Sequence, residues 1–276
     1  MNSRIGITEE QSIACRKVLL ELAEVLAPWW DDIVVVGGVA VQLSLKEEAG
    51  QLMPTMDLDL ALDIRSISRS DIPEDMHTRL LAAYFEEPRP GGKAFRYFRT
   101  VTVDGNRIEV PVDFMTGVGF GSNSNRSVED VEGISVSKLD GCELAFHETE
   151  TIRLEETRPD GSTSAKYVRI PTDPYLLAMK GIALDARRPK DARDIYLMIT
   201  LHTGGVNSFV KRLLPLMEDL VLRRGLDKMR VAFKTIDAWG PKAVTEEAQE
   251  TGEEAENTQR AAYEQINALL DGLGLP

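Results

Sequence analysis

The sequence predicts an α/β (α+β) core with a mixed β-sheet, followed by a C-terminal helical domain. Short β-rich runs alternate with helical segments up to about Thr172, and apolar residues then recur at helical spacing. We therefore expect a first domain over 1–172 and a helical domain with an acidic tail over 173–276.

The clearest local signal in the first domain is Asp104-Gly105, which two β-rich runs flank. This dipeptide is typical of a two-residue hairpin turn, and Asp113 then lies at the end of the second strand. Helices are expected over 9–26, 39–45 and 73–84, and strands over 31–36, 58–64, 94–103, 106–115, 133–137, 142–146 and the two arms of a hairpin within 151–170.

The second domain shows only helical patterns. We expect its helices over 174–187, 189–202, 206–223, 226–239 and 260–270. The segment 245–259 is rich in charge and poor in aromatic residues, so we expect it to be mobile.

Composition excludes several classes of protein. No apolar stretch is long enough to span a bilayer, and the start, MNSRIGITEEQ, lacks the apolar middle of a secretory signal. Two cysteines, Cys15 and Cys142, form no CxxC pair, so we expect a cytoplasmic, reduced protein. Three widely spaced histidines argue against a zinc site.

The net charge of −13 is unevenly distributed and argues against a wide nucleic-acid footprint. The tail over 241–276 holds eight acidic and two basic residues. In contrast, 181–230 holds ten basic and six acidic residues. A local basic surface on this acidic chain is therefore compatible with the composition.

Asp57 stands directly before the apolar run LDLALDI, and Asp59 stands within it. Residues i and i+2 of a strand share a face, so Asp57 and Asp59 should project side by side while Leu58 and Leu60 face a core. Two like charges repel, and neither is cheap to bury. A divalent cation removes both difficulties, and Mg²⁺ prefers a few carboxylates together with substrate phosphates.

Asp113 extends this pattern. If its strand pairs beside the strand of Asp57 and Asp59, three carboxylates converge. Three carboxylates can hold two metal ions, the arrangement used for in-line phosphoryl or nucleotidyl transfer. An Asp-x-Asp pair is also common at strand edges without any metal.

Gly37-Gly38 follows a buried strand and precedes a helical segment. The helix start offers backbone N–H groups, and the absent side chains let a phosphate approach closely. The pair does not match G-x-G-x-x-G, because Val39 and Gln42 stand where glycines should be. An ordinary strand-to-helix turn is the alternative interpretation.

These residues, in this order, resemble the nucleotidyltransferase superfamily of DNA polymerase beta. Within it, GGVAVQL, TMDLDLAL, VDFM and LLAMKGIALDARRPKDARDIYLM are similar to the nucleotidyltransferase toxins of abortive-infection, type IV toxin–antitoxin systems. The resemblance covers roughly 33–198. It departs from the family at 46–54, which looks like an insertion, and at Gly38, where serine is frequent.

The resemblance implies a role for each matching residue. It implies Asp57 and Asp59 as metal ligands, with Asp113 as a third ligand or as the base that receives the acceptor's proton. It implies phosphate binding by Gly37 and Gly38, triphosphate binding by Lys180, and either ordering of the helical part or nucleotide contact by Asp191 and Asp194. The cofactor implied is Mg²⁺ or Mn²⁺, with an NTP as substrate.

Lys180, Asp191 and Asp194 also have simpler interpretations. A helical lysine is by default a solvated surface residue. Asp194 could pair with Arg187, Arg188 or Arg193.

We therefore expect an enzyme that transfers NMP from an NTP and releases pyrophosphate. The acceptor is expected to be tRNA or a protein, with the chain acting as a toxin that a partner antitoxin neutralises. Alternatives are a small-molecule acceptor such as an aminoglycoside, which the acidic chain would suit, and a non-catalytic nucleotide-binding protein on the same fold. No membrane partner is expected.

Overall fold

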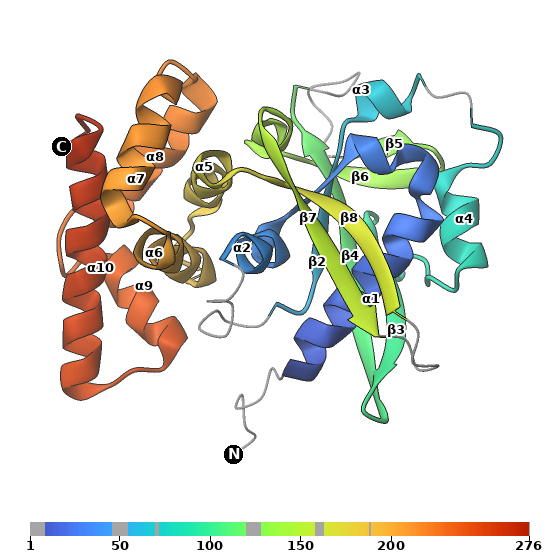
Figure 1. Cartoon of the computed structure of the whole chain (residues 1–276), viewed down its shortest axis with the longest axis horizontal. Coiled ribbons are helices and arrows are strands. Elements are labelled where there is room, and N and C mark those ends of the chain that lie inside the picture. The colour runs from blue at the N-terminus through green and yellow to red at the C-terminus, as the bar shows by residue number, and fades with distance from the viewer. Residues whose placement is uncertain are drawn as a thin grey trace. The chain divides into compact units, whose positions relative to one another are not determined.

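The computed structural model of the chain is shown in Figure 1, and it describes residues 9–45, 55–69, 72–119, 128–157, 163–187 and 189–275. The expected insertion over 46–54 and the turn of the hairpin around 159–162 lie outside these residues. Contacts divide the chain into two compact units. The first ends at Pro171, and the second, from Thr172 onward, also takes in the end of the helix that stops at Leu45, from Ser44.

The first unit contains a mixed main sheet and a separate two-stranded sheet, as the sequence predicts. In the main sheet the order is β1-β2-β4-β6-β5, and β3 pairs with β4 as well. The β2 strand is antiparallel to β1 and parallel to β4. The strands are β1 (Ile33–Val36), β2 (Leu58–Leu62), β3 (Arg96–Val103), β4 (Asn106–Gly117), β5 (Val128–Val131), β6 (Ile134–Leu139), β7 (Thr149–Thr157) and β8 (Thr163–Pro171), of which β7 and β8 form the second sheet.

The first unit also contains α-helices and 3₁₀ helices. They are α1 (Glu9–Val25), η1 (Ala27–Asp32), α2 (Gly37–Leu45), α3 (Ile64–Ile67), α4 (Met76–Ala82) and η3 (Cys142–Phe146). The α1 helix contacts both sheets, through β3, β4, β7 and β8 (Figure 1). Its residues Ala14, Val18 and Leu22 are spaced four apart and fully buried, as an amphipathic helix requires.

One predicted strand of this unit is wrong. Residues Cys142–Phe146 form a 3₁₀ helix, which begins after Gly141 with φ of 80°. Cys142 and Leu144 are two positions apart and both buried, so this short helix imitates the alternation of a strand. Neither β5 nor α3 was predicted from the sequence. The helix expected from residue 73 begins at Met76.

The second unit is helical throughout its described residues, as predicted. Its helices are α5 (Asp173–Ala183), α6 (Lys190–Leu201), α7 (Gly205–Leu213), η4 (Leu214–Leu216), α8 (Leu220–Ala232), α9 (Trp239–Ala248) and α10 (Gly252–Gly272). Close packing joins α5 to α8, because a Cβ on Gly225 would lie only 2.3 Å from the carbonyl oxygen of Ala178.

Two helical predictions in this unit need correction. The helix expected over 206–223 is interrupted after Leu213, and α8 restarts at Leu220 with Asp219 as its cap. The α8 helix ends at Ala232, so the helix expected over 226–239 is also wrong in its bounds.

The segment expected to be mobile, 245–259, belongs largely to α9 and α10. The C-terminal half of α10 buries Ala262, Ile266 and Leu269 against neighbouring helices. That packing stabilises the whole helix, including the charged turns that the composition alone made unpromising. Among the described residues, no helix is both long and apolar enough to cross a membrane.

Candidate active site

The pairing of β2 brings the first candidate residues together. Because β2 runs antiparallel to β1, Asp59 lies opposite Val36, the last residue before α2. Because β2 runs parallel to β4, Asp59 also lies opposite Asp113. Residues opposite one another on neighbouring strands share a face, so the strand pairing on which the expected convergence of carboxylates depends is present.

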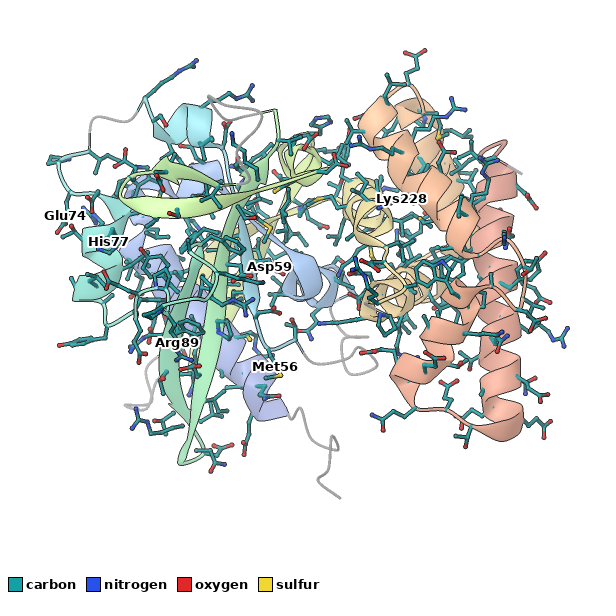
Figure 2. The ribbon with its side chains drawn as sticks, turned by 180° about the vertical axis from the view of Figure 1, so that it is seen from behind. Met56, Asp59, Glu74, His77, Arg89 and Lys228 are labelled. Atoms are coloured by element: carbon teal, nitrogen blue, oxygen red, sulfur yellow. The ribbon has the colours of Figure 1, made fainter. Side chains whose placement is uncertain are left out.

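Asp59 lies against the start of α2 (Figure 2). Gly37 has φ of 68°, and a Cβ at this position would lie 2.0 Å from Oδ2 of Asp59. Position 37 therefore requires glycine for two reasons. The backbone angle φ is positive, and the Asp59 carboxylate leaves no room for a Cβ. Gly38 is buried in the first turn of the same helix. The carboxylate at this helix start is favoured by the helix dipole.

Asp57 lies one residue before β2 and is the most accessible of the three aspartates. Its side chain is 41% exposed. The Thr55 hydroxyl donates a hydrogen bond of 3.2 Å to its Oδ1. Thr55 itself is buried, so this contact fixes one side of the Asp57 carboxylate.

Asp113 is held by two cationic side chains. Arg96 donates from Nε to Oδ1 at 2.5 Å and from a terminal nitrogen to Oδ2 at 2.7 Å. Lys93 donates to Oδ2 at 3.1 Å. The Asp113 side chain is only 5% exposed, and such a two-point guanidinium contact is the strongest ordinary partner for a buried carboxylate.

Arg96 also faces the other aspartates. Its guanidinium lies 3.7 Å from Oδ2 of Asp57. The hydrogen bonds to Asp113 raise the pKa of Arg96, burial opposes this shift, and the negative charges of all three aspartates add to it. The cluster therefore contains three carboxylates compensated in part by Arg96 and Lys93.

The donor chemistry of this cluster fits a hard divalent cation, since carboxylate oxygens are the ligands that Mg²⁺ prefers. The present arrangement is not a preformed metal site. Within the part of the chain that the structure describes, no group of three or more His, Cys, Asp or Glu side chains is placed to hold a metal ion. Asp57 and Asp59 would hold the cation, while Asp113 is engaged by Arg96 and Lys93.

Lys180, Asp191 and Asp194 form a second cluster, in the helical unit. The Lys180 ammonium donates to Asp191 at 2.8 Å and to Asp194 at 2.6 Å. Burial alone would lower the pKa of Lys180, but the charges and hydrogen bonds of Asp194 and Asp191 raise it above its ordinary value.

The simpler interpretations of this second cluster are not supported. Lys180 is 7% exposed and so is not a solvated surface residue. Asp194 pairs with Lys180, whereas Arg187 pairs with Asp185 and Arg193 lies near Glu250. Arg188 lies outside the described residues. The roles that the resemblance implies for this cluster stay predictions.

Sequence reasoning missed Arg96, Lys93 and Thr55. A signal for Arg96 was present, because the two-residue turn Asp104-Gly105 fixes the register of the hairpin. Counting outward from that turn places Arg96 opposite Asp113, as the structure shows. Lys93 and Thr55 lie outside regular strands, so no comparable count locates them.

Comparisons with known proteins add no family to this description. No protein-family model, no curated protein and no solved structure matches the chain.

Proposed function

We propose that this protein is a nucleotidyltransferase that transfers NMP from an NTP to an acceptor, with Mg²⁺ or Mn²⁺. One observation carries the proposal. Asp59 lies opposite Asp113 on the neighbouring parallel strand and also against Gly37, where α2 begins. Carboxylates for a cation and a helix start for phosphates thus occur at one edge of the sheet.

The reaction requires one bond to form and one to break. A hydroxyl oxygen of the acceptor attacks the α-phosphorus of the NTP, the bond from that phosphorus to the oxygen bridging to the β-phosphate breaks, and pyrophosphate leaves. When bound, Mg²⁺ or Mn²⁺ supplies positive charge that lowers the pKa of the hydroxyl and offsets the charge of the leaving group.

The chain's own residues have distinct parts in this proposal. Asp57 and Asp59 hold the cation, and the first turn of α2 at Gly37 and Gly38 receives phosphate oxygens through backbone N–H groups. Asp113 either joins Asp57 and Asp59 as a third ligand or takes the hydroxyl proton, and both roles require that its contacts with Arg96 loosen. Lys180, which the resemblance implies as a triphosphate ligand, is paired with Asp191 and Asp194 within the helical unit and is assigned no step here.

An RNA acceptor is favoured by the local positive charge of α8. Arg223, Arg224 and Arg230 are all exposed on α8, although the chain as a whole is acidic. An exposed basic helix suits a polyanion better than a cationic small molecule. We extend the proposal to tRNA modification by a toxin that a partner protein neutralises.

The test is incubation of the protein with each α-labelled NTP, Mg²⁺ or Mn²⁺, and total RNA. Label is expected in RNA and should be lost in the double variant Asp57→Ala, Asp59→Ala. The matched control is Asp63→Ala, because Asp63 follows β2 and caps α3. Label that the double variant incorporates undiminished would refute the proposal, and label in protein would move the acceptor to protein. Growth arrest on expression, absent in the double variant, tests the toxin role.

A further inference from the structure

We propose that Arg96, assisted by Lys93, is a resident counterion that competes with a divalent cation for Asp113 and so weakens cation binding until substrate arrives. This inference rests on the proposed function, because it concerns the same carboxylates. It accounts for the absence of a preformed metal site among the described residues, despite three neighbouring aspartates.

The contacts of Asp113 are the first support. Both of its oxygens accept hydrogen bonds from Arg96, and Oδ2 accepts another from Lys93. Its side chain is almost fully buried. A cation that takes Asp113 as a ligand must therefore displace existing hydrogen bonds instead of water.

The position of Arg96 is the second support. The same guanidinium that holds Asp113 approaches Asp57 to 3.7 Å. A divalent ion between these aspartates would meet a fixed positive charge at close range, beside the buried side chain of Asp113. Arg96 therefore opposes the cation both by occupying Asp113 and by repulsion.

A triphosphate changes this balance. Its oxygens are strong partners for a guanidinium, which binds phosphate as well as carboxylate in the two-point geometry. Arg96 can then exchange Asp113 for the substrate, and Asp113 becomes available to the cation. The cation alone should therefore bind weakly. A complex of nucleotide and cation should bind more tightly, because its phosphates pair with Arg96 and its cation pairs with Asp113.

The experiment measures Mn²⁺ binding without nucleotide, by calorimetry or by the electron paramagnetic resonance signal of free Mn²⁺. Arg96→Gln removes the charge and is expected to raise Mn²⁺ affinity about tenfold, since a nearby charge shifts proton binding to a carboxylate by about one unit or more. Arg96→Lys keeps the charge and should bind as weakly as the unmodified protein. Asp57→Asn should abolish binding in each background.

Arg99→Gln is the matched control. Arg99 lies on the same strand and is as buried as Arg96, but its partner is Glu21, at 2.6 Å. Its loss should leave Mn²⁺ affinity unchanged. Lys93→Gln is a second probe, because the Lys93 side chain is 52% exposed and its replacement is tolerable for folding. We expect it to raise Mn²⁺ affinity in the same direction as Arg96→Gln, but less.

The outcomes separate this inference from the proposed function. Tighter Mn²⁺ binding by Arg96→Gln and Lys93→Gln, with Arg99→Gln unchanged, supports the inference. Unchanged or weaker binding by both variants overturns it, while Mn²⁺ binding that depends on Asp57 leaves the proposed function intact. No binding by any variant overturns the inference and removes the cation from the proposed function as well.

Discussion

Replacement of Gly37 by alanine tests how the candidate site is built into the fold. The backbone at Gly37 has φ of 68°, where an L-residue costs about 1–2 kcal/mol. The new methyl group would in addition lie 2.0 Å from Oδ2 and 2.9 Å from Cγ of Asp59. Asp59 must move, and overpacking of this kind costs about 1–3 kcal/mol. We therefore expect Gly37→Ala to lower the free energy of unfolding of the first unit by roughly 2–5 kcal/mol.

Gly105→Ala separates these two contributions. Gly105 has φ of 86°, but a Cβ there has no atom within 4 Å. It should cost only the backbone contribution of about 1–2 kcal/mol, and it should leave the site unchanged. The difference between the two variants then measures the contact between position 37 and Asp59.

The assay must report the first unit alone, because a chain of two units need not unfold in one step. The chain has three tryptophans, of which Trp29 and Trp30 lie in the first unit and Trp239 lies in α9. In a Trp239→Phe background, tryptophan fluorescence during urea denaturation follows the first unit. Equal destabilisation by Gly37→Ala and Gly105→Ala, with NMP transfer retained by both, would refute this account of the site.

Two further predictions concern buried polar groups. Lys180→Met should destabilise the helical unit by about 3–5 kcal/mol in chemical denaturation, because it leaves Asp194 buried without its ion-pair partner, whereas exposed Lys211→Met should change little. Burial, Glu87 and Asp75 raise the pKa of Tyr97 from 10.0 to about 12. Between these pH values the unfolded chain has lost the phenol proton and the folded chain has not, so stability should fall as pH rises through this window. Burial also raises the pKa of Tyr196, so an ultraviolet titration should show late-ionising tyrosine absorbance that Tyr97→Phe reduces by one residue. A late phase of unchanged amplitude in that variant would contradict the assignment.

Local patterns were sufficient to predict much of the fold. The hairpin of β3 and β4 follows from Asp104-Gly105, because a two-residue turn with both residues at positive φ matches the twist of paired strands. The failures have a common cause. Residues 142–146 pack against β1, β4 and β8, and the charged segment 245–259 is helical because other parts of α9 and α10 are buried. Periodicity within a short window contains no information about such contacts.

The candidate site divides in the same way. The position of Asp59 opposite Asp113 follows from the pairing of their strands, and the position of Arg96 opposite Asp113 follows from the hairpin register. Asp57 lies one residue before β2, so its expected shared face with Asp59 stays a prediction. The contact between Gly37 and Asp59 could not be predicted in this way. It depends on the antiparallel pairing of β1 with β2 across the segment 46–54, whose length fixes no register.

The three aspartates also explain how like charges can stand in a buried strand before any ligand binds. Asp57 keeps contact with water, Asp59 lies at the start of α2, and Asp113 is neutralised by Arg96 and Lys93. The three charges are thus compensated by solvent, a helix dipole and cationic side chains, of which Arg96 faces all three aspartates. Folding of this sheet therefore does not require a metal ion, unlike folding around a structural zinc site. A cation that binds here therefore acts in substrate binding and chemistry. Its binding free energy is less favourable than that of an open carboxylate site, because it must displace Arg96 from Asp113.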